Sequence, residues 1–255
     1  MRIIVTRPAA QAADWVARLQ ARGIDAVALP LIGIAPVEDG SALVAAWRTL
    51  ERQRLVVFVS PNAGEQFFSH RPPSLAWPDA VLAASPGPGT TRVLVELGVP
   101  AGQIVEPAAD AAQFDSESLW LRLSTRDWQG ADVLIVRGDG GRDWLVDTLR
   151  SHGARVATVA AYGRVAPTFD EHAAALLRAA IERPQSHLWF FSSSEAIDNL
   201  ATSAPPAAAA EWSRAQAIAT HPRIAARARQ LGFAQVIESR PSLDAVAACI
   251  QSIRP

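Results

Sequence analysis

The chain has 255 residues, of which 24 are basic, 25 are acidic and 49% are hydrophobic. This balance supports ordinary folded cores and argues against a general binder of nucleic acid or of membrane surfaces. Apart from histidine, every basic residue is arginine, which excludes a Schiff-base lysine and the lysines that hold nucleotide phosphates or pyridoxal phosphate. The single cysteine, Cys249, excludes an intramolecular disulfide, a thiolate zinc site and an iron–sulfur cluster, and we expect it to be buried.

Apolar runs and amphipathic stretches predict alternating strands and helices along the whole chain. In the first half we expect strand 3–6, helix 9–22, strand 26–29, linker 30–36, helix 41–53 with Ser41 as N-cap, buried strand 56–59, strand 81–84, helix 90–97, strand 103–105 and helix 115–124 with an Asp115 cap. In the second half we expect a strand–helix–strand unit at 132–162, helix 171–182, buried strand 188–191, strand 215–219, helix 222–230, strand 235–238 and helix 242–253. Loops are expected at 71–78 and 107–113, and a mobile surface crossing at 205–210.

Three pieces of the sequence occur twice, in the same order. The first pair places Arg7 on Arg137, and the second places Ser60 on Ser193. A repeat that fills half of the chain is far too long for a solenoid unit and predicts two similar domains. The matching pairs are 2–36 with 132–167, 55–68 with 187–200, and 83–98 with 217–232.

The repeated strand–helix–strand pattern predicts an α/β fold of two similar, open, parallel-sheet (flavodoxin-like) domains. We expect ten strands, five in each domain. A simple duplication would divide the chain near Thr125. Alternatively, the two proline-ended segments, Pro30 to Pro36 and Ala161 to Pro167, pair as a two-stranded hinge, which puts the intervening chain in one domain and both chain ends in the other.

Ligands of open parallel sheets bind beyond the carboxyl ends of the strands, where loops lead into helices. Six such loops combine hydroxyls, glycines, prolines and arginines, at 6–8, 60–62, 85–91, 137–142, 192–195 and 220–224. Helix capping explains any one of their Ser or Thr residues. Six loops in two copies favour anion binding, since helix starts offer free N–H groups and a positive dipole end. The predicted substrate-binding residues are Arg7, Ser60, Asn62, Thr90, Arg137, Ser193 and Arg223.

Other kinds of site find less support in the sequence. The glycine-rich run from Gly138 to Gly141 lacks the third glycine of a dinucleotide-binding fingerprint, because Asp143 stands there. The five histidines have no metal-ligand spacing, and His221, the only one in a candidate loop, is better explained as a loop polar residue than as a proton donor. We therefore expect no metal and no nucleotide cofactor.

Several short motifs, taken in order, resemble the uroporphyrinogen-III synthase family. They are T-R-P, V-F-V-S-P-N-A, P-G-T-T, L-I-V-R-G-D-G-G-R, A-Y-G-R, F-F-S-S-S-E-A and A-T-H-P-R-I-A, and they cover nearly the whole chain. The resemblance implies two α/β domains joined by a two-stranded ladder, and so favours the hinge arrangement over the simple cut. The implied division is domain 1 at 1–35 and 167–255, domain 2 at 38–160, and hinge strands at 30–37 and 161–167.

The resemblance also implies a cyclising hydro-lyase of tetrapyrrole and heme biosynthesis that works without cofactor or metal. Its substrate, hydroxymethylbilane, is closed to uroporphyrinogen III with loss of water and inversion of the last pyrrole ring. A cleft of arginines and backbone amides suits the many carboxylates of this linear tetrapyrrole. We expect a cytoplasmic enzyme, because no apolar run approaches the roughly 20 residues of a bilayer span and no signal peptide is apparent. We further expect a monomer that binds neither nucleic acid nor membrane.

Within the family pattern, a hinge tyrosine falls on Tyr162 and a threonine before a helix falls on Thr90. The matching threonine of the second domain is replaced by Ile224, which follows Arg223. We expect Tyr162, the only tyrosine, to be the catalytic proton donor for the departing hydroxyl, because a phenol stays protonated at neutral pH. A purely structural role in the hinge is the alternative for Tyr162. The alternative function is a non-enzymatic two-domain protein that closes on a polycarboxylate or another anion.

Overall fold

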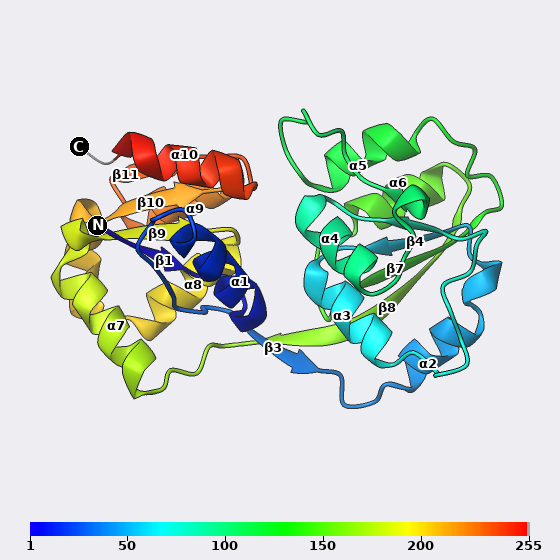
Figure 1. The fold of residues 1–255 in the computed structure, drawn as a ribbon, viewed down its shortest axis with the longest axis horizontal. Helices are drawn as coiled ribbons and strands as arrows, with labels where there is room; N and C mark the ends of the chain where they lie inside the picture. The colour runs from blue at the N-terminus through cyan, green and yellow to red at the C-terminus, as the bar shows by residue number, and fades with distance from the viewer. Residues whose placement is uncertain (254–255) are drawn as a thin grey trace. The chain divides into compact units, whose positions relative to one another are not determined.

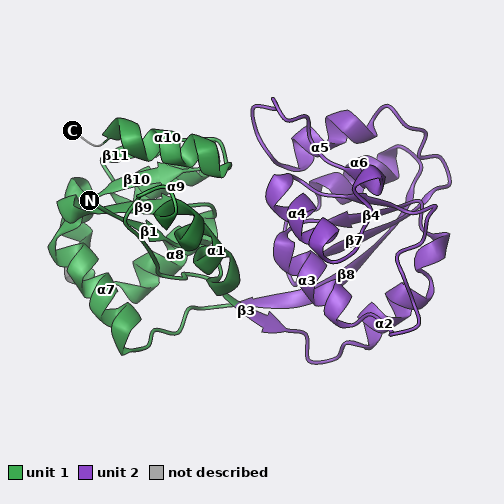
Figure 2. Cartoon of the chain, viewed as in Figure 1, with its two compact units in different colours: residues 1–33, 165–255 green, residues 34–164 purple. Residues whose placement is uncertain are grey.

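The computed structural model describes residues 1–253, and the chain divides into two compact units (Figure 2). Unit 1 comprises Met1–Gly33 and Val165–Pro255, and unit 2 comprises Ile34–Arg164. Both ends of the chain therefore belong to unit 1, and the chain passes between the units twice. The two passages fall within residues 30–37 and 161–167, the segments that the sequence assigns to the hinge.

Unit 1 is built on a five-stranded parallel sheet. Its strands are β1 (Arg2–Val5), β2 (Ala26–Ala28), β9 (His187–Phe191), β10 (Gln216–Ala219) and β11 (Gln235–Glu238). Their order across the sheet is β11-β10-β9-β1-β2, so the chain leaves β1 for β2 on one side and returns to β9 on the other. This is the flavodoxin-like order, in which ligands bind at the point where the direction of winding reverses.

Helices cover both faces of the unit 1 sheet (Figure 1). They are α1 (Ala9–Gln20), α7 (Glu171–Glu182), α8 (Ser194–Ser203), α9 (Pro222–Leu231) and α10 (Leu243–Ile253), with short 3-10 helices at Pro184–Ser186, Pro206–Ala210 and Trp212–Arg214. On one face, α1 and α10 pack onto Leu188 and Phe190 of β9. Because side chains alternate along a strand, Trp189 and Phe191 point to the other face, where Trp189 meets Trp212 edge to face.

Unit 2 is built on a six-stranded sheet. Its strands are β3 (Gly33–Pro36), β4 (Leu55–Phe58), β5 (Leu82–Ala84), β6 (Ile104–Val105), β7 (Asp132–Gly138) and β8 (Arg155–Val165). The order across the sheet is β3-β8-β7-β4-β5-β6, and β8 to β6 are joined by parallel pairs. The winding reverses between β7 and β4, which lie side by side.

The helices of unit 2 form two separate apolar cores, one on each face of the sheet. They are α2 (Ser41–Arg48), α3 (Pro61–Ser69), α4 (Pro88–Glu96), α5 (Ser116–Leu123) and α6 (Trp144–Ser151), with 3-10 helices at Leu50–Arg52 and Ala101–Gln103. Helices α2, α3 and α4 supply one core, which also contains Phe58 and Tyr162. Helices α5 and α6 supply the other, together with Trp128.

The two units share one plan, which confirms the predicted pair of similar open parallel-sheet domains. Strands β7, β8, β4, β5 and β6 of unit 2 occupy the places that β1, β2, β9, β10 and β11 occupy in unit 1. The plans differ in one respect that matters for the site. Strand β2 ends at Ala28, whereas its counterpart β8 continues without a break to Val165 and carries β3 along its free edge.

Some local expectations were wrong. The described residues form eleven strands rather than ten, because β3 forms within the expected linker and pairs with β8. Ser41 is the first residue of α2 rather than its cap, since Asp39 accepts hydrogen bonds from its N–H and its hydroxyl and Gly40 takes the N-cap position. Within the expected surface crossing at 205–210, where the sequence predicts no regular structure, Pro206–Ala210 form a 3-10 helix in which Ala208 is buried. Cys249 is only partly buried, against the α1 and α10 core.

Candidate active site at the carboxyl ends of the two sheets

Arg7 lies directly after β1, at the point where the winding of unit 1 reverses. Its guanidinium lies over the Trp15 ring at 4.6 Å and over the Phe190 ring at 5.7 Å, and Nη1 donates to Gln11 at 3.3 Å. The Nε atom is buried and has no partner within the described part of the chain. Burial lowers the pKa of the Arg7 guanidinium to about 10, against the opposing effect of the Asp14 carboxylate. Arg7 is therefore a desolvated cation with an unused donor.

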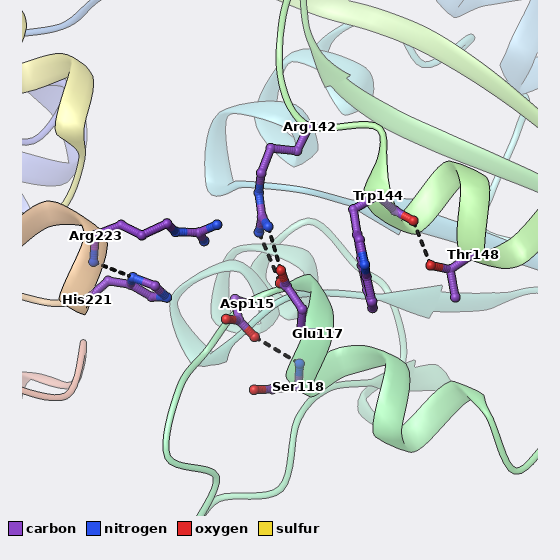
Figure 3. A network of polar contacts seen from close by, with 8 residues as sticks. All are labelled: Asp115, Glu117, Ser118, Arg142, Trp144, Thr148, His221 and Arg223. Carbon is purple, nitrogen blue, oxygen red and sulfur yellow. Dashed lines mark hydrogen bonds and ion pairs between the residues drawn. The ribbon is translucent and has the colours of Figure 1, made fainter.

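The other two predicted residues of unit 1 follow β9 and β10. Ser193 caps α8, and its hydroxyl accepts a hydrogen bond from the backbone N–H of Glu195 at 3.2 Å. His221 caps α9 by accepting from the backbone N–H of Arg223 at 3.1 Å, as Figure 3 shows. The guanidinium of Arg223 is exposed and makes no ion pair with a described residue. Both helix starts, and one available cation, thus lie at the same end of the sheet as Arg7.

In unit 2 the reversal point lies between Ser60, which follows β4, and the loop that follows β7. Ser60 caps α3 by accepting from the backbone N–H of Ala63 at 3.2 Å. The same Ser60 oxygen lies 3.0 Å from the phenol oxygen of Tyr162. Tyr162 itself is only 1% exposed, so its hydroxyl meets Ser60 and not solvent. Asn62, in the first turn of α3, is buried as well.

A break in the pairing of β7 and β8 creates the place for the Tyr162 ring. The register shifts between Arg137 and Gly138, so that Gly138 pairs with Tyr162 and the N–H of Asp139 donates to the Tyr162 carbonyl at 2.9 Å. A Cβ atom at Gly138 would lie 3.1 Å from the ring, closer than side chains normally approach. Glycine at this position therefore lets the ring lie flat against the backbone. The sequence showed Gly138 only as part of a glycine-rich run.

Thr90 lies in the first turn of α4, after β5. It is 4% exposed, and its hydroxyl has no hydrogen bond to another described residue. Its neighbour Thr91 is occupied, since it donates to the Glu106 carboxylate at 2.6 Å and lies 2.7 Å from the Ser85 hydroxyl. Sequence reasoning missed Glu106, because nothing in a two-residue edge strand indicates that the next side chain reaches a neighbouring loop.

The end of β7 and the loop that follows it carry two arginines in ion pairs. Arg137, with 19% of its side chain exposed, pairs with Asp143, and Arg142 pairs with Glu117 of α5. The Glu117 carboxylate raises the pKa of Arg142 mainly through this hydrogen bond. Figure 3 shows the Arg142–Glu117 pair together with Trp144, which is 38% exposed at the start of α6.

The predicted residues therefore lie at the carboxyl ends of the strands of their own unit. Unit 1 presents Arg7, Ser193 and Arg223, and unit 2 presents Ser60, Asn62, Thr90, Arg137 and Tyr162. Ser60 and Tyr162 are joined by a hydrogen bond between their side chains. Ile224, which replaces the family threonine, is a buried apolar residue in the first turn of α9.

Three further observations concern a groove, metal ligands and membrane spans. A groove of about 560 Å³ runs along edge strand β6 and α5, where Glu106, Arg122 and Arg126 line it, and it contains none of the predicted site residues. Among the described residues, no three His, Cys, Asp or Glu side chains gather in a way that could hold a metal ion. The part of the chain that the structure describes also contains no helix with the length and hydropathy of a membrane span.

Comparisons with known proteins agree on one family. The family model described as "Uroporphyrinogen-III synthase HemD" matches residues 13–248. The chain is 30% identical to the uroporphyrinogen-III synthase of Salmonella typhimurium over 173 residues, which are 67% of this chain and 68% of that protein. It is 27% identical to the enzyme of Synechococcus elongatus over 83% of this chain and 77% of that protein.

Solved structures of the same name share the fold. The uroporphyrinogen-III synthetase of Helicobacter pylori aligns over 100% of both chains with a TM-score of 0.61 at 15% identity. A mutant uroporphyrinogen III synthase of Thermus thermophilus aligns over 99% of this chain and 96% of its own, with a TM-score of 0.60 at 16% identity. At such low identity these structures support the fold alone. Since the family model spans nearly all of the sequence, the chain belongs to the uroporphyrinogen-III synthase family.

Proposed function

We propose that the chain closes hydroxymethylbilane to uroporphyrinogen III, with loss of water and inversion of the terminal pyrrole ring. The observation that carries this proposal is the family match over residues 13–248, which includes every predicted site residue except Arg7. The reaction makes the protein a cyclising hydro-lyase of tetrapyrrole biosynthesis. The rival function, a binder that closes on an anion without turnover, is not favoured by the family.

The chemistry requires little covalent help from the protein. Loss of the hydroxymethyl oxygen as water needs an acid and leaves an electrophilic azafulvene. The substituted carbon of the far ring attacks it to give a spiro intermediate, which fragments and recloses. Because uncatalysed closure gives the uninverted isomer, the main task of the protein is to hold the chain so that one carbon lies nearer than another. Few side chains then need be individually essential.

We infer that the carboxylates of the substrate bind at the arginines and helix starts described above. Arg7 supports this role because its buried Nε has no partner among the described residues, and Arg223 because its exposed guanidinium forms no ion pair with any of them. Thr90 adds a hydroxyl at the start of α4 that no described residue engages. The caps of α3 and α8, Ser60 and Ser193, place backbone N–H groups at positive helix ends. Asn62 and Arg137 complete the proposed binding set.

We further propose that Tyr162 supplies the proton for the departing hydroxyl. Its ring packs in the apolar core of unit 2, with the Arg164 guanidinium 6.0 Å from the ring centroid, and its hydroxyl contacts Ser60, which supports a specific role for this hydroxyl pair. The two units, in this proposal, are the two domains, and β3 with β8 forms the hinge between them. In this proposal the protein is a cytoplasmic monomer that works without cofactor or metal. The balanced charge of the chain, 24 basic against 25 acidic residues, supports a protein that is not a general binder of nucleic acid or of membrane surfaces.

Turnover of fresh hydroxymethylbilane tests the function. The products are oxidised to uroporphyrins, and the I and III isomers are separated and quantified. The purified chain should give mainly isomer III, while a blank without protein gives isomer I. Isomer I alone, formed at the uncatalysed rate, would contradict the proposal, and retention of unreacted substrate on the protein would favour the binder.

Substitution of the arginines tests the binding set. Arg223→Gln should weaken binding by about 1–3 kcal/mol, the range for charge-assisted hydrogen bonds, and should raise KM with little change in kcat. Added salt should raise the KM of the unchanged chain, because screening weakens attraction between exposed charges. A KM that responds neither to salt nor to this substitution would remove the polycarboxylate interpretation. Arg214→Gln, which removes an exposed arginine paired with Glu211, is the matched control.

A further inference from the structure

We propose that Ser60 is the group that hands the proton to the departing hydroxyl, and that Tyr162 stands behind Ser60 and replaces that proton. This inference rests on the proposed function and gives its acid a route to the substrate. Tyr162 is 1% exposed within the apolar core of unit 2, so its phenol does not meet a bound ligand. Ser60 is only partly buried, at the carboxyl end of β4, and its oxygen is 3.0 Å from the phenol.

A count of donors and acceptors assigns the direction of the hydrogen bond. The Ser60 oxygen has two lone pairs, and one of them accepts from the N–H of Ala63 at 3.2 Å. If Ser60 donated to Tyr162, the phenol proton would be a buried donor without a partner, which costs about 1–3 kcal/mol. If Tyr162 donates to the second lone pair of Ser60, both the phenol proton and the Ala63 N–H have an acceptor. The Ser60 proton is then left to donate outward.

The surroundings of Ser60 also favour a proton transfer through it. Ser60 caps the nine-residue helix α3, whose positive end stabilises negative charge on the oxygen during the transfer. The ring of Tyr162 packs against Gly138 at the register shift, and the Arg164 guanidinium, 6.0 Å from the ring centroid, favours negative charge on the phenol. The pair is therefore pre-organised, with the inner hydroxyl dry and the outer one accessible.

The second copy of the fold shows that the helix cap does not depend on a phenol. Ser193 is the counterpart of Ser60, and it caps α8 through the N–H of Glu195. Since Tyr162 is the only tyrosine of the chain and lies in unit 2, unit 1 has no phenol to place beside Ser193. A serine cap at this end of the sheet therefore forms without a tyrosine partner.

Two protons move in sequence through the Tyr162–Ser60 pair. The C–O bond of the hydroxymethyl group breaks as its oxygen takes the Ser60 proton, and water leaves. The Tyr162 proton moves to the Ser60 oxygen, which leaves a tyrosinate beside a cationic azafulvenium. When the macrocycle closes, the unsubstituted α-carbon of the last pyrrole ring forms the final bond and loses its proton, and this proton returns through Ser60 to Tyr162. Ser60 touches the reacting group, whereas Tyr162 acts through Ser60.

Single and double substitutions test the relay in the full-length chain, with hydroxymethylbilane as substrate. Ser60→Ala and Tyr162→Phe should each lower kcat by about 10²–10⁴, the usual worth of a general acid, and should change KM much less. The double variant should be about as slow as either single variant, because the two residues act as one unit. Ser60→Thr keeps the hydroxyl and should restore most of kcat. Asp170→Ala removes an exposed helix cap of α7 and should leave kcat unchanged.

The single tyrosine allows a sharper measurement. Growth on 3-fluorotyrosine replaces Tyr162 and no other residue with a more acidic phenol. The alkaline limb of the kcat profile should then move to lower pH in the Ser60 chain and should not move in Ser60→Ala. A phenol with a purely structural role would leave the profile in place. Should Ser60→Ala fold poorly, Ser60→Gly removes the hydroxyl while keeping a good cap residue.

The outcomes separate the relay from the proposed function. If the unchanged chain forms isomer III and Ser60→Ala keeps near-normal kcat, the relay is wrong and the function stands. If the losses from the two substitutions multiply, the residues act independently and the relay is again wrong. If the unchanged chain forms no isomer III, both the function and the relay fail.

Discussion

Replacement of Arg7 by methionine should make unit 1 more stable and the protein a poorer binder of its substrate. Burial lowers the Arg7 pKa from its ordinary value to about 10, which corresponds, at about 1.4 kcal/mol per pKa unit, to roughly 3 kcal/mol taken from the charged form. Methionine has a similar length, carries no charge, and can keep sulfur contacts with the Trp15 and Phe190 rings.

The expected gain is smaller than this desolvation cost. The substitution also loses the cation–π contacts at 4.6 and 5.7 Å, worth about 0.5–2 kcal/mol, and one hydrogen bond to Gln11. We therefore expect Arg7→Met to raise the free energy of unfolding of unit 1 by about 1–2 kcal/mol, consistent with other replacements of buried charges by apolar groups. Loss of a charge-assisted contact should raise KM by about 10–100-fold.

Urea unfolding and the KM for hydroxymethylbilane together form the assay. Arg137→Met is the matched control, because it removes the arginine at the same place in the repeat, where Asp143 already pairs with it. This control should give no gain in stability. A fall in stability on Arg7→Met would show that the ring contacts outweigh the desolvation cost. Greater stability with an unchanged KM would show that Arg7 does not bind the substrate.

Three further predictions concern stability and domain structure. Trp189→Phe removes a buried indole N–H that has no partner among the described residues, so the free energy of unfolding should change by less than about 1 kcal/mol. The comparison variant, Trp128→Phe, removes an indole that donates to the Leu123 carbonyl, and it should lower the free energy of unfolding in urea by about 1–3 kcal/mol. Burial, and to a lesser extent the Glu96 charge, raise the pKa of Glu65, so the ionised carboxylate opposes folding once the pH rises above that pKa. Glu65→Gln should therefore stabilise the protein at neutral pH and have no effect below about pH 4. Equal effects on the free energy of unfolding at pH 3 and pH 7 would contradict this. A fragment of residues 34–164 should unfold in one cooperative transition, whereas residues 1–125, which combine strands of both sheets, should not fold; cooperative unfolding of residues 1–125 would favour a tandem arrangement.

The sequence by itself determined the elements and their duplication. Strands such as β4 and β9 are wholly buried apolar runs, and helices such as α1 carry one apolar face, so both are visible in the local pattern. The order of these elements predicts parallel sheets, because short loops and intervening helices require it. The start of α2 was predicted wrongly because Asp39 and Ser41 are both residue types found at helix starts. Only the path of the backbone decides which of them accepts the hydrogen bond there.

The tertiary structure decided what each predicted site residue can do. Arg7 and Arg137 occupy the same place in the repeat, yet Arg7 lies among rings that include Phe190, while Arg137 pairs with Asp143. The sequence indicates an arginine in both cases, and the environment that makes one a desolvated cation comes from a strand far along the chain. Tyr162 shows the same limit. Its phenol meets Ser60 because β8 passes its ring over Gly138 next to the end of β4, and such proximity depends on how strands are ordered in the sheet rather than on any local pattern.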